Sequence, residues 1–181
     1  MSAGKWVKVP VGPQSRRWNT APVERTVLVV VHTVTALNRL DDVVPVFDSD
    51  RRVQLVHTIP GASAIESGVE HELNRRGVVL LPWEQAIALE FDLAISVHNS
   101  GNLHEIAAPL AVLSHGIGFT KYSSRKPEAG SRKPEAGNRK PETGNRDVYG
   151  LSVQTLVQGG AVVPSAVVLA HHEEIERLAA A

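Results

Sequence analysis

Short apolar runs alternate with longer mixed segments along the chain from Thr26 onward. The runs are rich in β-branched residues and are too short to be buried helices, so they predict strands. Alternation of such strands with helical segments is typical of βαβ units, in which a parallel sheet is covered on both faces. The expected strands lie at 26–31, 53–59, 78–83, 93–97 and 110–114.

The first two segments between these strands carry helical signals. Apolar residues recur at helical spacing over 37–47, and Pro45 makes this helix short or kinked. Ser63 and Glu66 fit a capping box before the next helix, and Gly77 fits its end. Both segments therefore have the character of crossover helices.

The later segments are shorter. A short helix is expected within 83–91 and another within 171–181. The segment 156–170 is either a hairpin about Gly159 and Gly160 or a further pair of strands. The sequence therefore predicts a single Rossmann-like α/β domain with a mostly parallel sheet and helices on both faces.

A seven-residue phrase interrupts this pattern. Ser124–Gly130 and Ser131–Gly137 both read SRKPEAG, and Asn138–Gly144 reads NRKPETG. Each unit lacks an apolar pair and contains proline and glycine, which excludes a coiled coil and favours an exposed, disordered loop. The expected organisation is a flexible basic leader at 1–25, the α/β domain at 26–122, the repeat loop at 123–147 and the remainder of the domain at 148–181.

Composition narrows the functional classes. The chain has 181 residues, 43% hydrophobic content and a formal net charge of +0, as expected for a soluble domain that does not bind nucleic acid. The absence of cysteine excludes disulfides, thiolate metal sites and cysteine nucleophiles. The longest aliphatic run, 27–31, is far too short for a membrane helix. A cytoplasmic protein without an integral membrane segment is expected.

Histidines and small polar residues cluster where the predicted strands end. In a doubly wound sheet, the carboxyl ends of the strands face a common crevice, which is the usual ligand site. Each histidine by itself also fits a satisfied structural group. The residues expected to bind substrate in this crevice are His32, Thr33, His57, His98, Asn99 and Ser100.

The segment SHGIGFTK offers a further histidine, His115, on a glycine-rich turn after the fifth predicted strand. Gly116 and Gly118 let the backbone turn tightly, and Lys121 is suited to bind a phosphate or carboxylate. A histidine near its ordinary pKa is suited to take a proton from a hydroxyl nucleophile. The alternative is a plain turn with a half-buried imidazole.

Other chemical signals are weaker or missing. The polar turn that begins the segment 98–106 has N–H groups suited to an anion, although turn chemistry alone explains such a stretch. His172 and Glu176 have the spacing of a metal pair, but a solvated helix face is the expectation, and no metal site is predicted. A glycine-rich phosphate loop is missing, so no nucleotide cofactor is expected. A G-x-S-x-G elbow is also missing, which disfavours a hydrolase.

Three segments resemble a known family. Residues 26–47, 81–121 and 149–178 are similar to the amino-terminal half of actinobacterial GT-B-type transferases related to CDP-glycerol glycerophosphotransferases. The resemblance covers about residues 26 to 180 apart from the repeat. It implies half of a GT-B architecture, in which a separate donor domain binds the nucleotide.

The segment HGIGFTK resembles the His-Gly motif of that family. The resemblance implies that His115 is the catalytic base on the acceptor hydroxyl, that Gly116 forms the turn and that Lys121 contacts phosphate. The expected function is therefore the acceptor-side domain of a glycosyl- or glycerophosphotransferase-like protein, incomplete without its donor domain. Its expected substrates are a nucleotide-activated donor and a polyol phosphate. The alternative is a non-catalytic binding or scaffold module derived from such a transferase.

Overall fold

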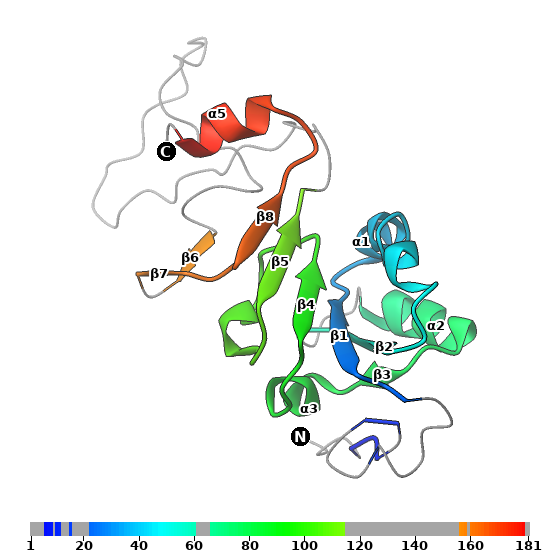
Figure 1. Cartoon of the computed structure of the whole chain (residues 1–181). Coiled ribbons are helices and arrows are strands. Elements are labelled where there is room, and N and C mark those ends of the chain that lie inside the picture. The colour runs from blue at the N-terminus through cyan, green and yellow to red at the C-terminus, as the bar shows by residue number, and fades with distance from the viewer. Residues whose placement is uncertain are drawn as a thin grey trace, which may run out of the picture.

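The computed structural model describes residues 6–8, 10–11, 15, 22–60, 66–114, 156–158 and 160–179. Six strands of this part of the chain form the main sheet: β1 (Arg25–Val30), β2 (Val53–Thr58), β3 (Leu80–Leu81), β4 (Leu93–Ser96), β5 (Leu110–Leu113) and β8 (Ala166–Val168). Their order is β3-β2-β1-β4-β5-β8, and every neighbouring pair is parallel (Figure 1). The predicted α/β fold is confirmed.

Helices and a small hairpin complete the domain. The helical elements are α1 (Val34–Leu40), the 3₁₀ helix η2 (Val44–Phe47), α2 (Glu66–Arg76), α3 (Trp83–Ile87), the 3₁₀ helix η3 (Leu103–Glu105) and α5 (Glu173–Ala179). The hairpin pairs β6 (Val157–Gln158) with β7 (Ala161–Val162) in antiparallel fashion. Figure 1 shows α5 beyond the carboxyl end of β8.

The two faces of β1 belong to two different hydrophobic cores. Val27 and Val29 pack with Leu37 of α1 and with residues of α2, whereas Leu28 and Val30 pack with residues of α3 and η3. Successive side chains of a strand point to opposite faces, so one continuous apolar run supplies both cores. The predicted coverage of both sheet faces by helices is therefore confirmed.

Proline and glycine set several element boundaries. The helical spacing over 37–47 is divided between α1 and η2, with Pro45 in the first turn of η2. The predicted strand at 78–83 reduces to Leu80–Leu81, because Pro82 caps α3 and has no N–H for a ladder bond. Gly77 ends α2 with a φ of 67°, the left-handed conformation that glycine adopts without strain.

The segment 156–170 forms the hairpin, which was the first of the two alternatives, and adds one further strand. Its first part is the β6–β7 hairpin, and its second part is β8, which pairs with β5 at the edge of the main sheet. Residues near the end of the described chain thus contribute a sixth strand to the sheet.

Two residues of the predicted leader pack on the domain. The backbone of Val7 forms two hydrogen bonds with the side-chain amide of Gln85, at 2.8 and 2.7 Å. Val11 is 4% exposed and belongs to the core beneath α3. Ser63 of the predicted capping box and the repeat at 123–147 lie outside the described residues. Among the described helices, none is long and apolar enough to cross a membrane.

Candidate functional site

The sheet reverses its winding direction between β1 and β4. From β1 the chain moves through α1 to β2 and then to β3 on one side, and it returns through α3 to β4 on the other side. The order β3-β2-β1-β4-β5-β8 is the doubly wound order, with β8 in the sixth position. In such sheets the loops after the two central strands diverge, and ligands bind in the crevice between them.

Histidines from both central loops meet at this position. The Nε2 atom of His32, after β1, lies 2.9 Å from the carbonyl oxygen of Ser100, after β4. A carbonyl oxygen only accepts, so Nε2 carries the proton and donates it. The ring centroids of His32 and His98 are 5.2 Å apart, with the ring planes inclined at 52°. The structure thus brings together His32, His98 and Ser100, as well as Asn99 between the last two.

Burial favours the neutral form of the His32 ring. Desolvation lowers the pKa of His32 below its usual value, and the hydrogen bond to Ser100 opposes this shift only in part. The buried Nδ1 atom has no hydrogen-bond partner within the described part of the chain. In the tautomer fixed by Ser100, Nδ1 carries a lone pair, so its chemistry is that of a hydrogen-bond acceptor.

A buried serine shapes the turn that carries His98. Ser96 is 0% exposed, and its hydroxyl donates to the carbonyl oxygen of His98 at 2.6 Å. The same hydroxyl oxygen accepts the backbone N–H of His98 at 3.2 Å. This role of Ser96 was not predicted from the sequence, although a serine at the end of an apolar strand can signal a side chain that hydrogen-bonds to the backbone of the following turn.

The next residue of the turn with a special conformation is Gly101, whose φ is 84°. A side chain at this position would lie 3.7 Å from Pro60, so the loop after β4 approaches the loop after β2. The side-chain amide of Gln158 in β6 donates to the carbonyl oxygen of Gly101 at 3.4 Å. The loops after β2 and β4 and the hairpin therefore meet beside the switch point.

Thr33 has a structural task at the crevice. Its hydroxyl oxygen accepts the backbone N–H of Ala36 at 3.0 Å, which makes Thr33 the N-cap of α1. The residue lies next to His32, where the sequence predicted it, but its oxygen is engaged by the helix.

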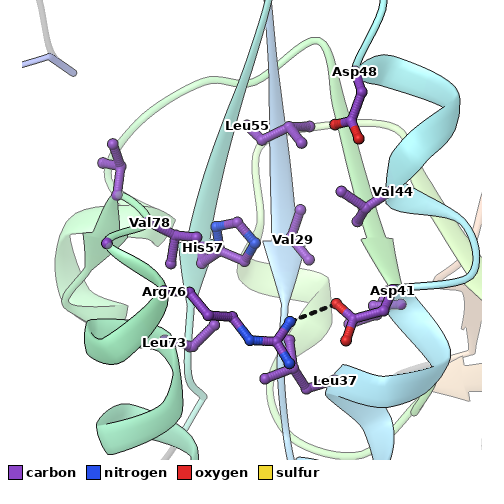
Figure 2. Close-up of a pocket in the computed structure, with 13 residues that line it drawn as sticks. Val29, Leu37, Asp41, Val44, Asp48, Leu55, His57, Leu73, Arg76 and Val78 are labelled. Atoms are coloured by element: carbon purple, nitrogen blue, oxygen red, sulfur yellow. Dashed lines mark hydrogen bonds and ion pairs between the residues drawn. The ribbon is translucent and has the colours of Figure 1, made fainter.

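His57 lies apart from the other histidines. It pairs with Val29 one position before β2 ends, so its side chain lies on the sheet face that α1 and α2 cover. It lines a cavity together with residues of those helices (Figure 2). Neither His32 nor His98 lines this cavity. The predicted residues therefore do not share a single crevice. His57 lies within a strand and faces the helices that cover the sheet, whereas His32 and His98 lie beyond strand ends and face the crevice.

The predicted base His115, together with Gly116 and Lys121, lies outside the described residues. The residue before His115, Ser114, donates its backbone N–H to the carbonyl oxygen of Val168 at 2.8 Å. Its hydroxyl donates to a carboxylate oxygen of Glu174 at 2.6 Å.

Glu174 belongs to the segment 171–176, which the sequence predicted to be a solvated helix face, but its side chain is buried. It is 5% exposed, and its second oxygen accepts the backbone N–H of Ala170 at 2.8 Å. Glu176 is exposed on α5, and His172 is exposed in the turn just before this helix. Glu174 thus fastens α5 to the end of β5. Within the described residues, no group of three or more His, Cys, Asp or Glu side chains is arranged to hold a metal ion.

Comparisons of the chain with protein-family models, with curated proteins and with solved structures found no significant match. The resemblance to GT-B-type transferases therefore remains a prediction from the sequence, and the geometry of the switch point carries the functional proposal.

Proposed function

We propose that this chain is the acceptor-side domain of a glycosyl- or glycerophosphotransferase-like protein, and that its ligand binds at the carboxyl ends of β1 and β4. The observation that carries the proposal is the meeting of His32 and His98 at the point where the doubly wound sheet reverses. The two residues come from different loops, so their convergence is a property of the fold and not of one turn.

The side chains at this position favour a hydroxyl-bearing ligand. The imidazoles of His32 and His98, the amide of Asn99 and the hydroxyl of Ser100 together offer both donors and acceptors to the hydroxyl groups of a polyol. A hydroxyl group that attacks an activated donor loses its proton, and a nearby neutral histidine is suited to accept it. The resemblance assigns that role to His115, which follows β5, the neighbour of β4 in the sheet.

The loop after β1 also favours an acceptor over a nucleotide. A dinucleotide-binding loop uses glycines at this position so that the backbone approaches a diphosphate closely. Here β1 is followed by Val31, His32 and Thr33, all of which carry branched or bulky side chains. Binding of the nucleotide-activated donor by a separate domain agrees with this composition.

The test is isothermal titration calorimetry with glycerol 3-phosphate, CDP-glycerol and UDP-glucose as probes. Glycerol 3-phosphate is expected to bind the parent chain, and His98→Ala is expected to weaken that binding about tenfold, the effect of losing a hydrogen bond to a charged or polar ligand. His71→Ala, which changes an exposed histidine on α2, is the matched control and should leave binding unchanged. Failure of the parent to bind glycerol 3-phosphate, or equal effects of the two variants, would contradict the proposal.

The alternative is a non-catalytic binding or scaffold module derived from such a transferase. The observation in its favour is that the Nε2 atom of His32 and the hydroxyl of Thr33 already form hydrogen bonds within the fold, with Ser100 and Ala36. Binding of the polyol phosphate without any transfer, after a donor domain and its nucleotide substrate have been supplied, would select this alternative.

A further inference from the structure

A cavity of about 390 Å³ lies between the sheet and the helices α1, η2 and α2. Its walls are mainly aliphatic and include side chains from β1, β2 and all three helical elements (Figure 2). Ligand pockets in proteins span roughly 300 to 1,000 Å³, and an apolar cavity of about 150 Å³ already holds benzene. This cavity is therefore large enough for a small organic molecule.

One polar side chain is buried in this apolar wall. His57 is 6% exposed, and its Nδ1 atom has no hydrogen-bond partner among the described residues. The nearby carbonyl oxygen of Val79 accepts the backbone N–H of His57 at 2.7 Å. Burial lowers the pKa of His57 to about 4, so the ring is neutral at pH 7. An unpaired buried nitrogen costs free energy, and a ligand that hydrogen-bonds to it would recover that cost.

The charged groups at the rim of the cavity disfavour an anionic ligand. The guanidinium of Arg76 contacts Asp41 at 2.6 Å and Glu72 at 2.9 Å, so two carboxylates already neutralise it. Figure 2 shows the contact between Arg76 and Asp41 reaching from α2 to α1. Asp48 is the other charged residue that lines the cavity. An anion would therefore meet more carboxylate than free cation.

We propose that this cavity is a second binding site, for a neutral and largely apolar small molecule that carries one hydroxyl group and exchanges a hydrogen bond with His57. A hydroxyl group both donates and accepts, so it satisfies either tautomer of the imidazole. The aliphatic walls bind the apolar body of the ligand through burial of its surface. The site is independent of the crevice at β1 and β4, whose histidines do not line it.

Three probes that share a methylphenyl group test the proposal: p-cresol, toluene and p-toluate. At the position opposite the methyl group they carry a hydroxyl group, a hydrogen atom and a carboxylate, respectively. Binding is measured by titration while the methyl NMR signals of Leu73 and Val78, which line the cavity, are followed. We expect p-cresol to bind about fivefold more tightly than toluene, the effect of one net hydrogen bond. We expect p-toluate to bind more weakly than toluene. Equal affinity for p-cresol and toluene, or no shift of these methyl signals, would overturn the proposal.

Two sets of variants locate the site. His57→Leu should remove the preference for p-cresol over toluene while toluene still binds. Val44→Phe places a larger side chain in the cavity wall and should abolish binding of all three probes. Val46→Phe is its matched control, because Val46 belongs to the same short helix but is 71% exposed and does not line the cavity. This pair tests the site even if His57→Leu does not fold, and equal binding by the two phenylalanine variants would refute it.

Discussion

His32 donates a hydrogen bond from Nε2 to the carbonyl oxygen of Ser100 across 68 positions of sequence, with an N···O distance of 2.9 Å. This bond joins the loop after β1 to the loop after β4 at the point where the sheet reverses its winding. The same bond fixes which ring nitrogen carries the proton, so a single contact sets both the shape of the crevice and the chemistry of its histidine.

Loss of the hydrogen bond between His32 and Ser100 should destabilise the contact between the loops after β1 and β4. His32→Phe keeps an aromatic ring but removes the donor, and it should lower the free energy of unfolding by about 1 kcal/mol, the net value of one hydrogen bond. Urea denaturation measures the change. His104→Phe, at an exposed position, serves as the control. Equal stability of the two variants would show that the His32–Ser100 bond does not hold the loops.

The stability of the protein should fall as His57 is forced to take up a proton. Its pKa is lowered from 6.5 to about 4, chiefly by burial. Between these two values the unfolded chain binds more protons than the folded chain, so stability decreases as the pH falls from about 6.5 to 4. The shift corresponds to a loss of about 3 kcal/mol over that window.

Chemical denaturation of the parent and of His57→Leu at several pH values separates this contribution from others. The stability of the parent relative to His57→Leu should fall as the pH falls through the window, because only the parent carries a buried imidazole that resists protonation. Asp50 and Glu72, whose pKa values are lowered to about 2, lose their contributions chiefly at lower pH and do so in both proteins. A constant difference between pH 7 and pH 4 would be evidence against a buried neutral His57.

The carboxylate of Glu174 should hold α5 on the sheet. Glu174→Ala removes the acceptor for Ser114 and Ala170, and it should cost about 2 to 3 kcal/mol, since hydrogen bonds to charged groups are stronger than neutral ones. Protection of the α5 amides from hydrogen exchange reports the docking of this helix directly. Glu176→Ala, on the exposed side of α5, should leave that protection unchanged. Similar exchange in both variants would contradict the anchoring role.

Two glycines, Gly77 just after the end of α2 and Gly68 in its first turn, should respond to alanine with opposite signs. Gly77 has a φ of 67°, so Gly77→Ala should destabilise the protein by about 1 kcal/mol even though nothing lies within 4 Å of the added methyl group. Gly68 lies inside the helix, with Val34 at 3.9 Å from the added carbon, so Gly68→Ala should stabilise it by up to about 1 kcal/mol. Thermal unfolding of both variants checks the signs, and a shift in the same direction would be inconsistent with these conformations.

Local patterns predicted most elements of this fold, although not all of their bounds. The apolar runs predicted five strands of the sheet, and Pro45 and Gly77 set helix boundaries through conformational restrictions that act within a few residues. The same patterns placed His32 and His98 at strand ends, because a side chain that follows a parallel strand lies at the ligand-binding edge of the sheet.

The sequence alone determined which segments form strands and helices, because hydrophobic periodicity and turn residues act locally. The tertiary structure decided which segments meet. It joined β8 to β5, separated His57 from His32 and His98, and buried Glu174 against Ser114. These contacts depend on the order of the strands, on their register and on which face of the sheet each side chain occupies. They join residues that are far apart in the chain. A hydrogen bond between such residues leaves no periodic trace in the sequence, so only the folded arrangement shows it.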